Sequence, residues 1–137
     1  MKRIFIDTGA FLAKEIAADQ HHLAATRGWA QWADSPCPLY SSEHVLDETT
    51  TLLARRTTYA WAAEWARDAL DSGIRWLRAE EGEWRSSLDL MRKFADQGVT
   101  FTDCLSFAMM KREAIRHVFG FDRHFEAAGF SLWPERK

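Results

Sequence analysis

The large apolar residues of this chain gather in short runs, separated by segments with helical spacing. Residues 4–6 read Ile-Phe-Ile, and residues 117–121 read His-Val-Phe-Gly-Phe. An apolar run without polar alternation is typical of a strand buried on both faces of a parallel sheet. Between such runs, apolar side chains recur about every four residues, as Trp61 and Trp65 do, which predicts helices with one apolar face. Strands that alternate with helices predict an α/β fold with a mostly parallel central sheet.

Capping and helix-breaking residues set the boundaries of these elements. Serine, threonine and aspartate cap helix starts, whereas glycine and proline end helices. On this basis we expect helix caps at Asp19, Ser42, Thr57 or Thr58, and Thr102. The expected strands lie near residues 4–6, 39–41, 74–77, 117–121 and 130–133, and the expected helices near 9–14, 19–33, 43–56, 58–72, 81–95, 103–116 and 123–128.

The composition predicts one compact domain. The chain has 137 residues, of which 47% are hydrophobic and 13% aromatic. This length and apolar content suffice for a buried core and argue against disorder. No repeat or linker interrupts the pattern, so residues 1–137 are expected to form a single domain. The formal net charge of −2 shows no overall basic character, but it does not exclude RNA as a substrate because a local basic patch is sufficient.

The cysteines and the first residues of the chain indicate the cellular compartment in which the protein is expected. Cys37 and Cys104 form no Cys-x-x-Cys or Cys/His metal motif, and free thiols are typical of the reducing cytoplasm. Met1-Lys2-Arg3 is basic, but only three large apolar residues follow, too few for a signal peptide. No apolar segment approaches the length that spans a membrane. We therefore expect a cytoplasmic protein that does not associate with membranes.

Two acidic residues directly follow predicted strands. Asp7 ends the run at residues 4–6, and Asp122 ends the run at residues 117–121. If both strands are parallel, both carboxylates emerge at the carboxyl edge of the sheet, where open α/β proteins bind their ligands. Taken singly, each aspartate would more commonly be a turn or capping residue for the helix that follows.

Two further acids lie on predicted helices next to apolar faces. Glu48 is about one turn from both Val45 and Leu52, whereas Asp47 points to the opposite, solvent side. Asp103 opens a helix whose residues 104–110 are apolar nearly all round, which indicates burial. Ordinary alternatives remain open: a flank position for Glu48, and for Asp103 a first-turn acid favoured by the helix dipole.

Taken together, the four acids indicate a cation site. Carboxylates gathered at one edge repel one another and are costly to bury unless a cation joins them. Ligation by oxygen alone suits Mg²⁺ or Mn²⁺ rather than Zn²⁺. Such ions position water and stabilise charge on a scissile phosphate. The pattern therefore predicts metal-dependent cleavage of phosphodiester bonds that needs no serine or cysteine nucleophile.

The order of these motifs resembles that of a known family. The chain contains, in order, Ile4-Phe5-Ile6-Asp7-Thr8, then Val45-Leu46-Asp47-Glu48 with Leu52-Leu53, then Phe101-Thr102-Asp103-Cys104 with Ala108, and Phe119-Gly120-Phe121-Asp122-Arg123-His124-Phe125. It is similar in length and motif order to PIN domains, in particular to the small VapC-type toxins of bacterial toxin–antitoxin pairs. Each motif is short, so the resemblance rests on the whole set.

The resemblance implies a three-layer α/β/α fold and an endoribonuclease that depends on Mg²⁺ or Mn²⁺. Asp7, Glu48, Asp103 and Asp122 match the family's four acidic positions, where they would be catalytic residues and metal ligands. Thr8 matches a hydroxyl residue that supports the first acid. The resemblance also implies a cytoplasmic toxin that acts on RNA, forms a homodimer and is neutralised by a cognate antitoxin encoded beside it.

The residues around Asp122 depart from the family and suggest substrate contacts. The family often has threonine or serine two residues before the last aspartate, where this chain has Gly120, so a hydroxyl that would orient Asp122 is missing. Arg123 and His124 adjoin Asp122 and are candidates for contact with substrate phosphate. A structural role for this pair is the alternative.

Other conspicuous residues are expected to be structural. His21 and His22 are adjacent, and adjacent helical positions point about 100° apart, so the two do not readily share one ion. The helix near residues 81–95 carries Trp84, Leu88 and Met91 on one stripe. The tryptophan-rich helices, with Trp29 and Trp32 and with Trp61 and Trp65, are more often core than function, and a hydrophobic groove or dimer surface is the second interpretation.

Two other enzyme classes and one non-catalytic function are alternatives for these residues. Asp7-Thr8-Gly9 is also the tripeptide of aspartic proteases, but those proteins are all-β and this chain is rich in helical periods. Phosphatases of the haloacid dehalogenase type need a second acid two residues after the first, where this chain has Gly9. A non-catalytic PIN-like protein that binds RNA or a partner is the remaining alternative, which Gly120 leaves open.

Overall fold

A single parallel sheet forms the centre of the computed structural model, which describes residues 2–135. Its five strands lie in the order β3-β2-β1-β4-β5, and every neighbouring pair is parallel. The predicted α/β class is therefore confirmed, with a sheet that is parallel throughout. The strands are β1 (Ile4–Ile6), β2 (Leu39–Ser42), β3 (Arg75–Leu77), β4 (His117–Phe119) and β5 (Ser131–Trp133).

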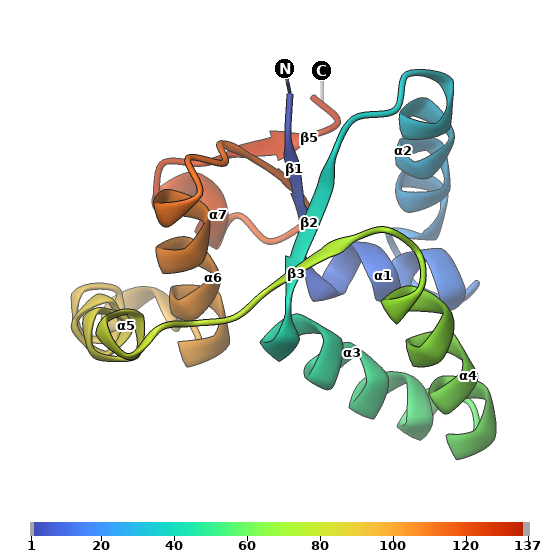
Figure 1. Cartoon of the computed structure of the whole chain (residues 1–137), viewed down its shortest axis with the longest axis horizontal. Coiled ribbons are helices and arrows are strands. Elements are labelled where there is room, and N and C mark those ends of the chain that lie inside the picture. Colours follow the sequence, from blue (N-terminus) through green and yellow to red (C-terminus); the bar gives the residue numbers. More distant parts are fainter. Residues whose placement is uncertain (1, 136–137) are drawn as a thin grey trace.

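Helices cover both faces of the sheet. Helices α1 to α4 lie on one side and α5 to α7 on the other (Figure 1), which confirms the three-layer α/β/α architecture. No helix within residues 2–135 is long and apolar enough to cross a membrane. The helices are α1 (Thr8–Glu15), α2 (His22–Asp34), α3 (Glu43–Arg56), α4 (Tyr59–Leu70), α5 (Glu81–Lys93), α6 (Phe101–Arg112) and α7 (His124–Ala127), with a 3₁₀ turn at Ala95–Gln97.

The strand order reverses direction beside β1. The chain moves outward from β1 to β2 and β3, and then returns across the sheet to β4 and β5 on the other side of β1. In open α/β sheets, the connections that follow the two strands at such a reversal lead to opposite faces of the sheet and leave a crevice outside the carboxyl ends, where ligands bind. The ends of β1 and β4 are therefore the first place to look for a functional site.

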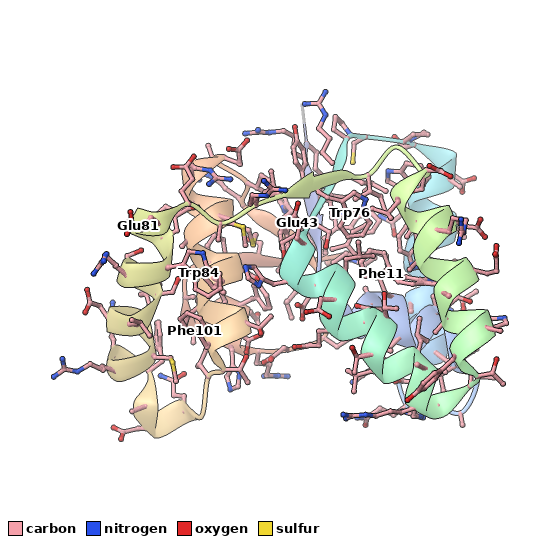
Figure 2. The ribbon with its side chains drawn as sticks, turned by 60° about the horizontal axis from the view of Figure 1, so that its bottom comes forward. Phe11, Glu43, Trp76, Glu81, Trp84 and Phe101 are labelled. Atoms are coloured by element: carbon pink, nitrogen blue, oxygen red, sulfur yellow. The ribbon has the colours of Figure 1, made fainter. Side chains whose placement is uncertain are left out.

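The core is built on β1 and on aromatic side chains from both helical layers. Ile4, Phe5 and Ile6 are completely buried, as the unbroken apolar run predicts for an inner strand. On the side of α1 to α4, Phe11 packs edge-on against Trp65 with ring centres 5.4 Å apart and stacks on Trp76 at 6.0 Å (Figure 2). Trp65 is partly buried and packs on the core, as expected, whereas Trp61, which was also expected there, is 41% exposed.

Hydrogen bonds at the helix starts correct two predicted boundaries. Helix α6 begins at Phe101, because the hydroxyl of Thr100, and not that of Thr102, accepts the backbone N–H of Asp103 at 3.1 Å. Helix α2 begins at His22, because the Asp19 carboxylate accepts the N–H of His21 in a turn before the helix. The Ser42 cap is confirmed, since its hydroxyl accepts the N–H of Val45.

Strand β4 is shorter than predicted. It ends at Phe119, whose carbonyl accepts the N–H of Asp7 at 3.0 Å, and the chain bends at the next residue. A Cβ on Gly120 would lie only 3.1 Å from the Cβ of Asp7. Glycine therefore lets the two chain segments approach closely, and Asp122 follows on a loop rather than directly after a strand.

The apolar stripe of α5 does not join the core. Trp84, Leu88 and Met91 are 43%, 53% and 40% exposed, so the side of α5 that carries the predicted stripe faces solvent. Helix α5 packs on α6 through other positions, including the buried Ser87 and the partly buried Leu90. The stripe is therefore available as a surface.

Two helical glycines allow a test of this packing. At Gly28 in α2, an added Cβ would lie 2.6 Å from Cζ of the buried Phe119 ring, whereas nothing lies within 4 Å of a Cβ at Gly82 in α5. Gly28→Ala should destabilise the protein by about 1–3 kcal/mol, because overpacking outweighs the gain of about 1 kcal/mol in helix propensity. Urea unfolding measures this change. Gly82→Ala is the matched control and should be neutral or stabilising; a stabilising Gly28→Ala would contradict this packing of α2.

Candidate active site

Asp7 occupies the sheet edge at the point of strand reversal. It follows β1 immediately and precedes the first residue of α1, where it takes an extended backbone conformation and makes no side-chain cap hydrogen bond. Only 8% of Asp7 is exposed. A carboxylate that is buried at a helix start without capping it must be held there for another reason, because burial of an unpaired charge is costly.

Asp103 approaches the same edge from α6. It is the third residue of that helix and is buried, while the residues after it along α6 are buried nearly all round. Its backbone N–H is bound by the Thr100 hydroxyl at 3.1 Å, so the first turn that carries the carboxylate is fixed. This agrees with the apolar pattern that indicated a buried helix.

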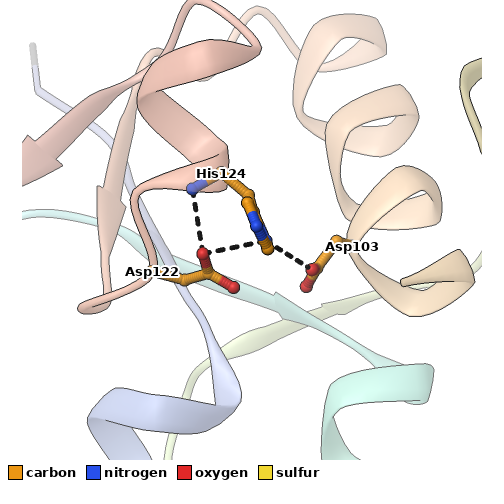
Figure 3. Close-up of side chains that lie close together, drawn as sticks. All are labelled: Asp103, Asp122 and His124. Atoms are coloured by element: carbon orange, nitrogen blue, oxygen red, sulfur yellow. Dashed lines mark hydrogen bonds and ion pairs between the residues drawn. The ribbon is translucent and has the colours of Figure 1, made fainter. Parts of the chain in front are cut away.

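Asp122 and His124 complete a compact group with Asp103 (Figure 3). The His124 backbone N–H donates to Oδ1 of Asp122 at 2.9 Å. The imidazole Nδ1 of His124 lies 3.0 Å from Oδ1 of Asp122 and 3.6 Å from Oδ2 of Asp103, but it is not aligned for a hydrogen bond with any described residue. One ligand atom from each of the three residues lies within 4.8 Å of the others, a spacing that could hold a metal ion.

A cleft of about 410 Å³ joins Asp103 and Asp122 to Asp7 and Glu48. Glu48 is half-buried on α3, and Thr8 begins α1. The structure therefore brings all four predicted acids and Thr8 to one cleft. The cleft is lined by Asp7, Thr8, Gly9, Leu12, Asp19, His21, Glu48, Leu52, Thr100, Asp103, Phe121 and Asp122.

The carboxylates raise one another's pKa values. The pKa of Asp7 is raised from 3.8 to about 8, first by burial and then by the charge of Asp103, with smaller contributions from Glu48 and Asp122; a hydrogen bond from the Thr8 backbone opposes them. The pKa of Asp103 is also raised, by burial and by Asp122, while hydrogen bonds with Thr100 and the charge of His124 oppose this. Thr100 and His124 therefore favour an ionised Asp103, whereas the Thr8 backbone is the one group that offsets the burial of Asp7 among the causes of its raised pKa.

The chemistry of this donor set fits a hard divalent cation. The carboxyl groups of Asp7, Glu48, Asp103 and Asp122 come from four different segments and line one cleft, and their mutual repulsion is the feature that a cation would relieve. The Thr8 hydroxyl, also in the cleft lining, is buried and has no hydrogen-bond partner among the described residues. A buried hydroxyl of this kind suits an ordered water or a ligand-bound oxygen.

The structure places the two predicted substrate contacts, His124 and Arg123, at different sites. His124 belongs to the acidic group, as described. Arg123 is exposed and lines a neighbouring depression with Glu126 and Leu132, and it is not among the described residues of the cleft. Its proposed contact with substrate therefore stays a prediction. Arg112, the last residue of α6, is engaged by Glu80, Glu83 and Glu113 and by the Arg78 carbonyl.

Sequence reasoning missed two aromatic residues of the cleft. His21 was assigned to a solvated helix start and Phe121 to a strand, yet their rings stack with centres 4.4 Å apart and planes 4° apart. Both line the cleft beside the carboxylates. They are 100 positions apart in the sequence, and no local pattern of a single chain links residues at that separation. The one available signal was that Phe121 immediately precedes Asp122.

The fold and the site together define a class: an α/β protein with a parallel sheet and clustered carboxylates at the strand reversal, typical of enzymes that use divalent cations to hydrolyse phosphate esters. The comparison with known proteins narrows this class, because the family model described as PIN domain matches residues 4–131. The chain belongs to the PIN domain family.

Individual relatives agree with this assignment. The chain is 33% identical over 127 residues to a protein of Mycobacterium tuberculosis named 23S rRNA-specific endonuclease VapC20, covering 93% of this chain and 95% of that protein. The crystal structure of VapC20, described as a sarcin-ricin loop cleaving toxin, matches with a TM-score of 0.83 over the same shares of the two chains. The VapBC2 structure from Rickettsia felis matches with a TM-score of 0.68 at 11% identity, covering 95% of this chain and 96% of that chain, and supports the fold.

The raised pKa of Asp7 predicts how stability depends on pH. Between about pH 4 and pH 8 the folded protein keeps a proton on Asp7 that the unfolded chain releases. The unfolded state therefore binds fewer protons, and Asp7 lowers the stability of the metal-free protein as the pH rises through this window. Asp7→Asn should raise the free energy of unfolding at pH 8 by about 1 kcal/mol or more and change it little at pH 4.

Chemical denaturation in EDTA at both pH values measures this effect. Asp89→Asn, which removes an exposed carboxylate from α5, is the matched control and should leave the pH dependence unchanged. An equal increase in the free energy of unfolding from Asp7→Asn at both pH values would show that the increase does not come from removing a buried and repelled charge.

Proposed function

We propose that this protein is a metal-dependent endoribonuclease and the toxin of a type II toxin–antitoxin pair. The observation that carries the proposal is the convergence of Asp7, Glu48, Asp103 and Asp122 on one cleft at the strand reversal. Support comes from the likeness to a VapC toxin named as an rRNA endonuclease. We take residues 1–137 to act as one domain, and RNA in the cytoplasm to be the substrate.

The four acids are proposed as the metal ligands and catalytic residues. Asp103 and Asp122, with His124, lie close enough together to hold one ion, and Asp7 and Glu48 complete the acidic lining. Mg²⁺ is the expected ion and Mn²⁺ the alternative, because oxygen ligands dominate. A bound cation of this kind supplies a polarised water and offsets negative charge on the scissile phosphate.

The protein's own contribution is to hold these groups in place and in the required charge state. Thr100 fixes the turn that carries Asp103, and the His124 backbone N–H holds Oδ1 of Asp122. Asp7, whose pKa is about 8 in the metal-free protein, retains a proton near neutral pH. That proton must leave when Asp7 becomes a ligand, because only the carboxylate binds a cation. We propose that the Thr8 hydroxyl, which is buried in the same cleft, supports this carboxyl.

Cleavage of RNA tests the proposal directly. With Mg²⁺ or Mn²⁺, the protein should cut an RNA pool and a sarcin–ricin loop oligoribonucleotide, which is the substrate class given for the similar VapC20. Asp7→Asn and Asp103→Asn should each lower the rate by at least about 100-fold, because loss of even an outer-shell partner of a metal ligand costs 10- to 100-fold. Gel electrophoresis of end-labelled RNA measures the cut sites and rates.

Two outcomes would contradict the proposal in different ways. Cleavage that survives EDTA would remove the role of the cation. Absence of cleavage with intact RNA binding would favour a non-catalytic PIN-like binding protein. Asp89→Asn, an exposed acid outside the cleft, is the matched control and should cut as the unmodified protein does.

A toxin requires a partner that restrains it. We propose a cognate antitoxin encoded beside this gene. Expression of the toxin alone should then arrest bacterial growth, and co-expression with the product of the adjacent gene should relieve the arrest. Arrest that persists with Asp7→Asn would point to a cause other than RNA cleavage.

A homodimer is also proposed, with the exposed stripe of α5 as its interface. Trp84, Leu88 and Met91 lie one turn apart along the helix. The Trp84 ring is braced by Phe101 of α6 at 5.5 Å and by His44 of α3 at 5.0 Å (Figure 2). An aromatic residue held rigidly on an apolar face is typical of an interface anchor.

Charge placed in the centre of the stripe tests the dimer. Leu88→Glu should convert the dimer to a monomer in sedimentation or light-scattering measurements, because a buried unpaired carboxylate is costly. Tyr59→Glu, at an exposed aromatic residue of α4 outside the stripe, is the matched control and should leave the mass unchanged. A monomeric unmodified protein, or a Leu88→Glu dimer, would exclude this interface.

A further inference from the structure

The carboxylates account for only part of the cleft. Its lining also includes the stacked rings of His21 and Phe121 and the side chains of Leu12 and Leu52. All four of these residues are half-buried. A site built only to bind a cation needs no such wall, because oxygen ligands and water suffice.

Each ring of the aromatic pair is held in position by contacts of its own segment. The N–H of His21 is bound by the Asp19 carboxylate at 2.8 Å, and the next residue, His22, contacts the Ala13 carbonyl through Nδ1 at 2.6 Å. On the other side, the Phe121 ring packs edge-on against the buried Phe119 at 6.4 Å. The turn before α2 and the loop after β4 therefore present two parallel rings with little freedom to rearrange.

The cleft combines acidic and aromatic side chains, which suit the phosphate and the base of a nucleotide respectively. A phosphate belongs at the acidic end, where a cation would join it to the carboxylates. A nucleobase is a flat, polarisable ring system that stacks on aromatic side chains irrespective of its identity. The ring pair adjoins the acids directly in sequence and in space, because Phe121 immediately precedes Asp122.

We propose that His21 and Phe121 form a stacking platform for a nucleobase next to the scissile phosphate. This inference rests on the proposed ribonuclease function and adds a requirement to it: the base must be unpaired. Within a duplex the two faces of a base are covered by its neighbours, whereas bases in loops can be splayed out and stacked on aromatic residues. The platform therefore selects single-stranded or loop RNA and positions the phosphate over the acids.

Abasic substitution tests this platform without relying on the loss of activity alone. The substrate is an oligoribonucleotide whose cut site has been mapped, with one base at a time removed on either side of the cut. For the unmodified protein, removal of the stacked base should lower kcat/KM by about five- to 150-fold, as expected for one base–aromatic stack. In His21→Leu the intact substrate should be cut more slowly, and removal of that base should have little further effect.

Three variants separate stacking from packing. His21→Phe keeps an aromatic ring and should keep most of the abasic effect, whereas Phe121→Leu should lose it as His21→Leu does. Leu23→Ala, two residues from His21 and at a 69% exposed position outside the cleft, should behave as the unmodified protein. These comparisons are ratios within each variant, so a partial loss of folded protein does not alter them.

Two results would overturn the platform. One is a full abasic effect in both His21→Leu and Phe121→Leu, which would mean that the rings only fasten two loops together. The other is the absence of an abasic effect at every position in the unmodified protein. Failure of the proposed function is distinct from both, since the unmodified protein would then cut no RNA at all.

Discussion

Repulsion among carboxylates at one edge of the sheet is the constraint on which this structure depends. Burial and the neighbouring acids raise the pKa of Asp7 to about 8, so the site is unfavourable in the protein alone. The surrounding structure must supply the free energy that keeps the site assembled. The fully buried β1 in front of Asp7 and the nearly all-apolar α6 behind Asp103 are the elements that do so.

The topology explains why these particular elements carry the acids. Because the strand order reverses beside β1, the chain leaves β1 for α1 in one helical layer and leaves β4 for α7 in the other, and the cleft lies between these two departures (Figure 1). Helices α3 and α6 belong to opposite layers, so Glu48 and Asp103 reach the opening from its two sides (Figure 1). Glycine at position 120 permits the close approach of the loop after β4 to Asp7.

Much of this arrangement could be predicted from the sequence, because its signals are local. The apolar run before Asp7 and the apolar helix after Asp103 both indicate burial, and such patterns along the chain predicted the fold class and the four acids. What could not be predicted depends on contacts between distant segments. The stack of His21 on Phe121 and the exposed stripe that includes Trp84 are set by packing in three dimensions. Thr100 was missed in favour of Thr102 because both can cap a helix, and only the packing of α6 decides between them.

The charge of the cleft has a thermodynamic consequence for its ligands. The protein carries a formal net charge of −2 and presents its acids where a polyanion must approach. A cation and an RNA phosphate in this cleft are then coupled ligands: each lowers the free energy of binding the other, and by linkage the two effects are equal. RNA should accordingly raise the affinity for the metal by the same factor by which the metal raises the affinity for RNA. The protein without RNA should then release the metal ion more easily than the protein with RNA bound.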